Sequence, residues 1–227
     1  MSLVDRALFK FFKTERTYSQ SGEDRILQLL FNNFGKSRIS YLDVGTNHPL
    51  MGSNTFLFYR NGGKGVCVEP NPELCQLIRK SRPRDKCLNV GLGTDDDRLA
   101  DFYLMSSHVL STFSSAEAHE LEAGGKYKIE RTIKIPIRNI NSIVKENFDE
   151  PIDLVSIDVE GWNEEIVRTI DFSSSRPFCF CVETLTFSDG RGGHKLDGII
   201  EFFLQNDYFV YADTYLNTIF VDNAQVN

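Results

Sequence analysis

Short apolar segments with strand character alternate with amphipathic segments along almost the whole chain, and this alternation most restricts its fold. Several strand candidates, such as IDLVSIDV (152–159), are apolar on both faces, as strands covered by helices on either side must be. Helix candidates lie between them, and the one at 71–81 has Pro72 in a first-turn position. Repeated βα units predict an α/β fold with a doubly wound, mainly parallel sheet. The predicted strands are 38–44, 65–69, 86–91, 152–159, 178–183, 208–213 and 217–222.

The chain shows no boundary that would divide it into several domains. Its 227 residues suit one domain with a sizeable core, and they contain no repeat, low-complexity tract or flexible linker. The middle differs, because two segments with strand alternation flank a polar, glycine-containing stretch. We expect a single domain over 1–227, with an N-terminal helix at 1–17 and a β insertion at 98–137 that acts as a lid over the site.

Charge and hydropathy argue against several classes of partner. The net charge of −7 gives no bulk attraction to nucleic acid or anionic lipid. No segment approaches the roughly 18 apolar residues of a membrane-spanning helix, and the N-terminus lacks a signal-peptide core. We expect no nucleic-acid partner and no stable membrane insertion, and the sequence carries no signal for a particular oligomeric state.

The five cysteines favour a reducing compartment. Their number is odd, they form no CxxC pair, and Cys67, Cys179 and Cys181 lie in apolar segments where cysteine acts as a small buried hydrophobe. Structural zinc needs paired ligands at set spacing, which the sequence lacks. We therefore expect a cytoplasmic protein and assign no metal site.

Polar residues that follow two predicted strands indicate a cofactor site. In YLDVGTNHP (41–49), Gly45 permits close backbone approach, and Thr46 and Asn47 offer hydrogen-bonding groups. The next predicted strand ends in Glu69, 24 residues after Gly45. An acid at this place suits a ribose, because two hydroxyl donors need a carboxylate acceptor.

A dinucleotide-binding loop has further glycines after the first, and here Asn47 and Pro49 stand in their place. This difference distinguishes between cofactors. A dinucleotide's pyrophosphate lies against bare backbone at a helix N-terminus, and Asn47, His48 and Pro49 would obstruct it. S-adenosylmethionine needs no pyrophosphate cradle. The loop therefore favours S-adenosylmethionine over a nucleotide-dependent oxidoreductase, which is one alternative. A binding module that keeps the cofactor without turnover is the other.

The segment SIDVEGWNEE (156–165) contains the best catalytic candidates. Methyl transfer is an in-line displacement, and a hydroxyl acceptor needs a base or a metal to remove its proton. Asp158 ends a predicted buried strand, and Glu160 points the same way if the backbone stays extended. Two neighbouring carboxylates raise each other's pKa. We assign both residues as catalytic; the alternative for Glu160 is an acid favoured by the helix dipole.

Several separate motifs resemble those of the FkbM-type S-adenosylmethionine-dependent methyltransferases. They are YSQSGED (18–24), YLDVGTNHP (41–49), SNTFLFY (53–59), GVCVEPNP (65–72) and LVSIDVEGWNEEIVRTIDF (154–172). The resemblance implies a class I methyltransferase fold, Rossmann-like, with a seven-stranded sheet whose last strand is antiparallel. It also implies O-methylation of a small-molecule or carbohydrate acceptor, for example a sugar of a polysaccharide or a secondary metabolite.

The same resemblance implies roles for individual residues. Asp43, Gly45 and Asn47 would line the methionine end of the cofactor, Glu69 would hold the ribose, and Asn71 would lie towards the adenine. Other polar residues fall at motif positions typical of the family. The predicted cofactor-binding residues are Gln20, Asp43, Gly45, Thr46, Asn47, Asn54, Glu69, Pro70, Asn71 and Asp158.

Overall fold

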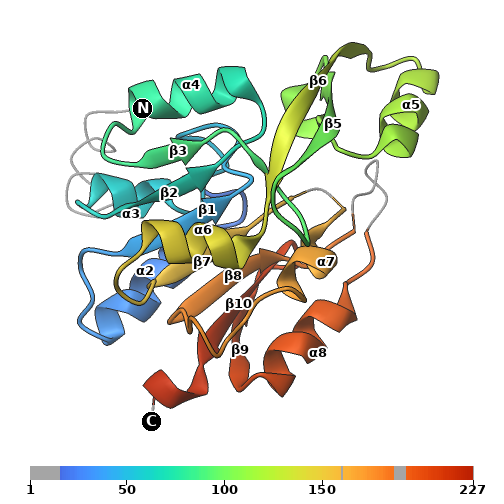
Figure 1. Cartoon of the computed structure of the whole chain (residues 1–227). Helices are drawn as coiled ribbons and strands as arrows, with labels where there is room; N and C mark the ends of the chain where they lie inside the picture. Colours follow the sequence, from blue (N-terminus) through green and yellow to red (C-terminus); the bar gives the residue numbers. More distant parts are fainter. Residues whose placement is uncertain (1–15, 160, 187–192, 227) are drawn as a thin grey trace, which may run out of the picture.

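The computed structural model describes residues 16–159, 161–186 and 193–226, and within them it contains a seven-stranded sheet with helices on both faces (Figure 1). The strand order is β3-β2-β1-β7-β8-β10-β9, and neighbouring strands are parallel except where β10 pairs. This order with one reversed strand is the class I, Rossmann-like topology, so the predicted fold class is confirmed. The strands are β1 (Ser40–Val44), β2 (Lys64–Val68), β3 (Lys86–Leu88), β7 (Leu154–Ile157), β8 (Cys179–Glu183), β9 (Tyr208–Asp213) and β10 (Asn217–Asp222).

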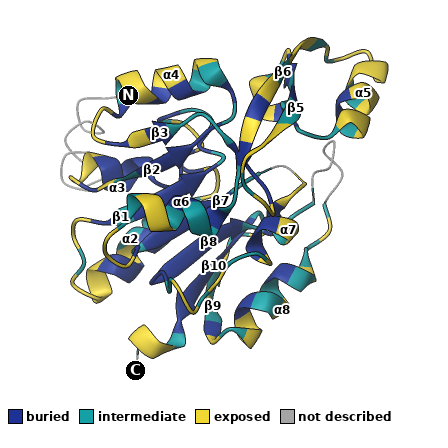
Figure 2. Cartoon of the chain, viewed as in Figure 1, coloured by how far each residue is buried: buried dark blue, intermediate teal, exposed yellow. Residues whose placement is uncertain are grey.

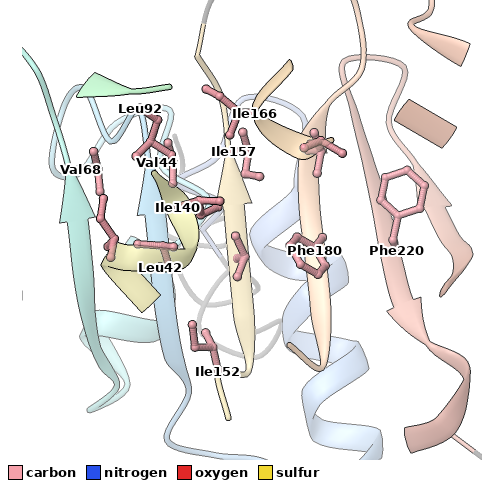
Figure 3. Packing of buried hydrophobic residues seen from close by; sticks show 14 of the residues in the cluster. Leu42, Val44, Val68, Leu92, Ile140, Ile152, Ile157, Ile166, Phe180 and Phe220 are labelled. Carbon is pink, nitrogen blue, oxygen red and sulfur yellow. The ribbon is translucent and has the colours of Figure 1, made fainter. Parts of the chain in front are cut away.

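The helices form a layer on each face, because side chains alternate along each strand. Leu42 and Val44 of β1 pack with α6, α7 and α8, whereas Tyr41 lies with α2 and α3 on the other face. Figure 2 shows the buried sheet between the layers, and Figure 3 shows Leu42, Ile157 and Phe180 from neighbouring strands in one cluster. The helices are α2 (Glu23–Asn33), α3 (Phe56–Arg60), α4 (Pro72–Ser81), α6 (Ile140–Asn147), α7 (Asn163–Val167) and α8 (Asp197–Gln205).

The chain between β3 and α6 forms a second sheet with the order β4-β6-β5, which projects beyond the main sheet in Figure 1. The strand predicted at 86–91 is split, because Asn89 donates hydrogen bonds to the carbonyls of Glu69 and Pro70 where the chain leaves β3. The structure contains one helix in this region, α5, that the sequence does not predict, because its apolar residues form no stripe along one face. The side chain of Ser114 caps the N-terminus of this helix. The elements are β4 (Gly91–Leu92), β5 (Arg98–Met105), η1 (His108–Leu110), α5 (Ser115–Ala123) and β6 (Ile129–Arg138).

The two ends of the described chain add little regular structure. The helix predicted at 1–17 lies outside the described residues except for 16 and 17, which are not helical. At the other end, the short 3-10 helix η2 (Asn223–Gln225) follows β10. None of the helices in the described ranges combines the length and the apolar character needed to cross a bilayer.

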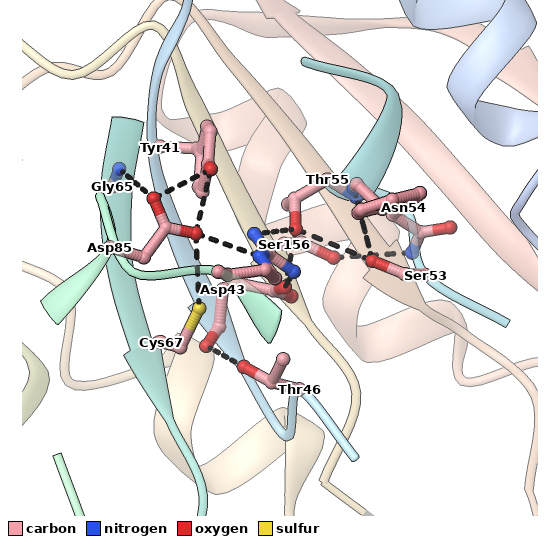
Figure 4. A network of polar contacts seen from close by, with 12 residues as sticks. Tyr41, Asp43, Thr46, Ser53, Asn54, Thr55, Gly65, Cys67, Asp85 and Ser156 are labelled. Carbon is pink, nitrogen blue, oxygen red and sulfur yellow. Dashed lines mark hydrogen bonds and ion pairs between the residues drawn. The ribbon is translucent and has the colours of Figure 1, made fainter. Parts of the chain in front are cut away.

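Figure 4 shows a polar network that includes Tyr41, Asp43, Thr55 and Asp85. Arg82, which follows α4, is fully buried in this network. Its guanidinium donates to Asp85 at 2.7 Å and to the hydroxyl of Thr55 at 2.9 Å, and it lies 3.5 Å from Asp43. The hydroxyl of Tyr41 also donates to Asp85. Burial raises the pKa of the Asp43 carboxyl, whereas Arg82 and Thr55 lower it. The guanidinium of Arg82 thus forms ion pairs with two buried carboxyl groups, those of Asp43 and Asp85.

Replacing Arg82 with methionine should lower the free energy of unfolding by about 3–5 kcal/mol, because buried carboxyl groups then lose their cationic partner. Urea denaturation measures this change. Arg168→Met is the control, since Arg168 forms an exposed ion pair with Glu164. Loss of that exposed pair should cost less than about 1 kcal/mol. Equal and small effects of both substitutions would contradict the role of Arg82.

Candidate active site

A cavity of about 450 Å³ lies at the carboxyl ends of β1, β2 and β7, and the second sheet contributes its opposite wall. The chain runs outward from β1 to β3 and then returns to β7 on the other side of β1. The cavity therefore lies at the topological switch point, where doubly wound sheets bind ligands. The predicted site residues that line it are Gln20, Gly45, Thr46, Asn47, Glu69, Pro70 and Asp158.

Glu69, directly after β2, is only 4% exposed, and backbone donors hold both of its carboxylate oxygens. Oε2 accepts the N–H of Asn47 and Oε1 accepts the N–H of Asn71, each at 2.8 Å. Burial raises the pKa of Glu69 to about 7, although these two hydrogen bonds lower it. Each oxygen keeps a further lone pair. The carboxylate is therefore fixed and can still accept two hydroxyl donors, as a ribose diol requires.

Asn47 provides a second acceptor on the same wall. Its backbone is left-handed, with φ at 51°, and its side-chain Oδ1 is buried without a hydrogen-bond partner among the described residues. A buried acceptor that lacks a donor is costly, so such an atom calls for an explanation. A hydroxyl or ammonium group of a ligand in the cavity would satisfy it, and S-adenosylmethionine carries both.

Gly45 brings the loop after β1 into contact with the turn after β7. Its φ is 74°, and a Cβ here would lie 1.7 Å from the carbonyl oxygen of Asp158. Any side chain would therefore displace that carbonyl. Thr46 fixes the same loop, because its hydroxyl donates to the carbonyl of Asp43 at 2.9 Å. The glycine thus allows two loops to share one wall of the cavity.

Asp158 follows β7 and lines the cavity near the centre of the sheet. Its N–H donates to the carbonyl of Val44 at 3.0 Å, which extends the pairing of β7 with β1. Burial raises the pKa of Asp158 to about 6; a hydrogen bond with Glu183 lowers it, and the charge of Asp43 raises it. A carboxyl group with such a pKa can exchange a proton near neutral pH. Glu160, the second predicted catalytic residue, lies outside the described residues.

Three predicted cofactor residues do not line the cavity. Asp43 belongs instead to the buried network around Arg82. Asn54 donates its side-chain N–H to the hydroxyl of Ser156 in β7 at 3.1 Å. The side chain of Asn71 caps α4 by accepting two N–H groups of the first turn. All three hold the loops and strands from which the cavity is built.

Gln20 reaches the cavity from the segment before α2, and two buried acids hold this segment in place. Asp24 is fully buried and accepts hydrogen bonds from two hydroxyls and one backbone N–H of residues 17–19. Glu23, also fully buried, accepts hydrogen bonds from side chains of the β9–β10 hairpin. The acids of the motif YSQSGED therefore fasten Gln20 to the carboxyl edge of the sheet.

The sequence predicted an insertion over the site at 98–137, but it assigned none of the residues with which the second sheet lines the cavity. These residues lie far along the chain from the cofactor motifs, and no local pattern marks them as lining a cavity. They include Arg98, Ala100, Phe102, His108, Val109, Phe113 and Ile137. Only the folding of β5 and β6 across the carboxyl edge of the main sheet brings them to the site.

Two residues inside the predicted motifs also line the cavity without an assigned role. Trp162, just before α7, is 38% exposed. His48 accepts the N–H groups of Leu50 and Met51 at Nδ1, at 3.2 and 3.1 Å. The neutral ring of His48 therefore carries its proton on Nε2. The sequence offered a signal for both residues: Trp162 is the single tryptophan and lies close to Asp158, and His48 lies in the predicted cofactor loop.

The cysteines and acids that the structure describes do not assemble into a metal site. In the ranges that the structure describes, no three or more His, Cys, Asp or Glu side chains are placed to hold a metal ion. All five cysteines are free and buried. Glu69 and Asp158 are instead held by hydrogen bonds from neighbouring groups.

Comparison with known families identifies the group to which the chain belongs. The methyltransferase FkbM domain matches residues 43–210, which is most of the chain. The chain belongs to the FkbM methyltransferase family. S-adenosylmethionine is the cofactor of this family, so the predicted cofactor is confirmed and the protein is an S-adenosylmethionine-dependent methyltransferase. This membership decides against the oxidoreductase alternative.

Solved structures of other methyltransferases are similar at low sequence identity. A TehB-like S-adenosylmethionine-dependent methyltransferase from Corynebacterium glutamicum is 12% identical, with 96% of this chain and 95% of that chain covered and a TM-score of 0.45. An O-methyltransferase from Bacillus cereus, in complex with S-adenosylhomocysteine, is 14% identical over 97% and 90% of the two chains, with a TM-score of 0.44. No curated protein is significantly similar in sequence. A shared fold does not define the acceptor.

Gly45→Ala should lower the free energy of unfolding by about 3 kcal/mol or more, from left-handed strain and displacement of the Asp158 carbonyl. Gly62→Ala is the matched control, because Gly62 has φ at 93° and nothing within 4 Å of an added Cβ. The control should cost only about 1–2 kcal/mol, from backbone strain alone. Urea denaturation compares the two variants. Similar costs would argue against the tight contact between the loops.

Proposed function

We propose that this methyltransferase transfers the methyl group of S-adenosylmethionine to a hydroxyl oxygen of a small-molecule or carbohydrate acceptor, such as a sugar or a secondary metabolite. The observation that supports this most directly is Asp158, a carboxyl group in the cavity whose pKa burial raises to about 6. A hydroxyl is a poor nucleophile at neutral pH, so its methylation needs a base of this kind.

The loops after β1 and β2 would hold the cofactor. Glu69 would accept hydrogen bonds from the two ribose hydroxyls, and Asn47 would accept one from a hydroxyl or ammonium group. Gly45 and Thr46 would form the adjoining wall, and Gln20 would close it from the segment before α2. The bound cofactor supplies a methyl group on a positively charged sulfur, so the protein's own task is to bind, to orient and to remove a proton.

Asp158 would accept the proton of the acceptor hydroxyl as the oxygen bonds to the methyl group. We also propose that the insertion at 98–137 covers the bound ligands, since Phe102 and Phe113 line the cavity from this side. Apolar walls keep water away from the reaction and strengthen the electrostatic interactions within it. Trp162, exposed beside Asp158, offers a flat surface to an acceptor that contains a ring.

We place the reaction in the cytoplasm. The support comes from the thiols, because all five cysteines are free and buried, and none forms a disulfide. Free thiols are typical of proteins in a reducing compartment.

Glu69→Ala should weaken binding of S-adenosylmethionine by about 1.5–3 kcal/mol, the range for hydrogen bonds to a charged group. The affinity of the wild-type protein for S-adenosylmethionine should also fall as the pH drops below about 7. Ribose hydroxyls donate to the ionised form of Glu69, so protonation of Glu69 competes with cofactor binding. Isothermal titration calorimetry at several pH values measures both effects. Glu73→Ala is the control, since Glu73 is an exposed acid in the first turn of α4. Unchanged affinity in folded Glu69→Ala would refute the ribose assignment.

A labelled-methyl assay tests the reaction itself. The protein is incubated with methyl-labelled S-adenosylmethionine and a panel of methyl glycosides, oligosaccharides, phenols, amines and thiols. We expect label on oxygen, located by NMR of the product, and at least a roughly hundredfold lower turnover in Asp158→Asn, as for a lost general base. Cofactor affinity should change much less, because Asn keeps the shape of the side chain.

Asp149→Asn, a change of the same kind at an exposed position, should leave turnover unaltered. Transfer only to nitrogen or sulfur would contradict O-methylation. Cofactor binding without turnover on any acceptor would support the binding-module alternative. Near-normal turnover in Asp158→Asn would make Asp158 structural. The melting temperature of each variant must be measured alongside, because a buried carboxylate can also stabilise the fold.

A further inference from the structure

The residue after β7 and the last residue of β8 form a pair of carboxyl groups. Ile157 pairs with Val182 in parallel register, so the next residues, Asp158 and Glu183, are neighbours at the carboxyl edge. In-register neighbours direct their side chains to the same face of a sheet. The register therefore places these two carboxyl groups beside each other, and Glu183 lowers the pKa of Asp158 as a hydrogen-bonding neighbour. Two carboxyl groups can form a hydrogen bond only when one of them carries a proton.

A buried amide fixes the far side of this pair. Asn163, in the first turn of α7, is only 2% exposed. Its Nδ2 donates to Glu183 Oε2 at 2.9 Å, and its Oδ1 accepts the N–H of Val159 at 2.8 Å. The amide therefore ties the end of β8 to the turn that carries Asp158. Both polar ends of Asn163 are used, so the geometry of the pair is held from behind.

The charged groups around the pair favour retention of the shared proton. Asp43 on β1 and Glu23 on α2 both act on Asp158 as negative charges. Cys181 lies nearby on β8 as a buried thiol. A negative environment stabilises the protonated form of an acid. The two negative charges of Asp43 and Glu23 therefore raise the affinity of Asp158 for a proton.

We propose that Glu183 is the positioning residue of Asp158: the two carboxyl groups share one proton, and Glu183, held by Asn163, keeps Asp158 oriented as the base. This inference rests on the proposed function, in which Asp158 removes the acceptor proton. In the reactive form the shared proton lies on Glu183, which donates a hydrogen bond to the ionised carboxylate of Asp158. The acceptor O–H bond then breaks and its proton goes to Asp158, while the oxygen–methyl bond forms and the sulfur–methyl bond breaks with its electron pair on sulfur. The pair then carries two protons and later releases one of them to water.

The titration of Asp158 tests the pairing without any acceptor. Protein with isotope-labelled aspartate carboxyl carbons is titrated by NMR, and the signal of Asp158 is assigned by its loss in Asp158→Asn. We expect a midpoint near 6 in the wild type. In Glu183→Gln the midpoint should fall by about one pH unit or more, because an amide N–H replaces the shared proton and a negative charge is lost. Gln keeps an oxygen for Asn163, so the local geometry is preserved.

Glu165→Gln is the matched control, because Glu165 is an exposed acid of α7 outside the pair. It should leave the Asp158 midpoint unchanged. A midpoint that does not move in folded Glu183→Gln would overturn the proposal. If that variant does not fold, wild-type protein labelled at glutamate decides instead. Glu183 and Asp158 must then show an inflection at the same pH, as two groups that share a proton do. Independent titration of Glu183 would overturn the proposal.

This result is separable from the outcome of the methylation assay. A shifted midpoint in Glu183→Gln together with normal turnover in Asp158→Asn would leave the pair intact and remove the base assignment. An unshifted midpoint together with a large loss of turnover in Asp158→Asn would leave the base assignment intact and remove the role of Glu183. A merely structural role of Glu183 would change the melting temperature without moving the Asp158 midpoint.

Discussion

The close contact between Gly45 and the carbonyl oxygen of Asp158 is the constraint on which the site depends. It joins the loop after β1, which carries Asn47, to the turn after β7, which carries the candidate base. The two strands are already paired, so the sheet brings the loops together and the glycine removes the last steric obstacle. A cofactor held by the first loop would therefore lie beside the carboxyl group of the second.

Several strands of the main sheet end in or next to an acidic residue, and the fold must compensate the charge of each acid that is buried. Asp43 lies one residue before the end of β1, and strand alternation turns it away from Leu42 and Val44 towards the opposite face. There the buried guanidinium of Arg82 compensates its charge. The ion pair of Asp43 with Arg82 stabilises the local structure only while both partners are present, because an unpaired buried charge destabilises the fold. The loop after β1 is thus anchored by the buried network around Arg82.

The sequence could predict the sheet and the residues that end its strands, because both depend on local periodicity. It predicted Gly45, Glu69 and Asp158 at one edge for this reason, and the structure brings all three to the cavity. It did not separate lining residues from supporting ones, such as Asn71, whose side chain caps a helix. That difference depends on side-chain partners distant in the chain. The wall from the second sheet and the pairing of Asp158 with Glu183 arise only from tertiary structure and register.

Glu69 and Asp158 show how one physical effect can serve two purposes. Burial raises the pKa of both carboxyl groups. The oxygens of Glu69 each face a backbone N–H, which cannot accept a proton and which favours the ionised form. Ligand hydroxyls would add to that preference, so Glu69 is suited to remain an acceptor. Asp158 faces another carboxyl group, which can take or give a proton. Different neighbours therefore make one acid suited to binding and the other to proton transfer.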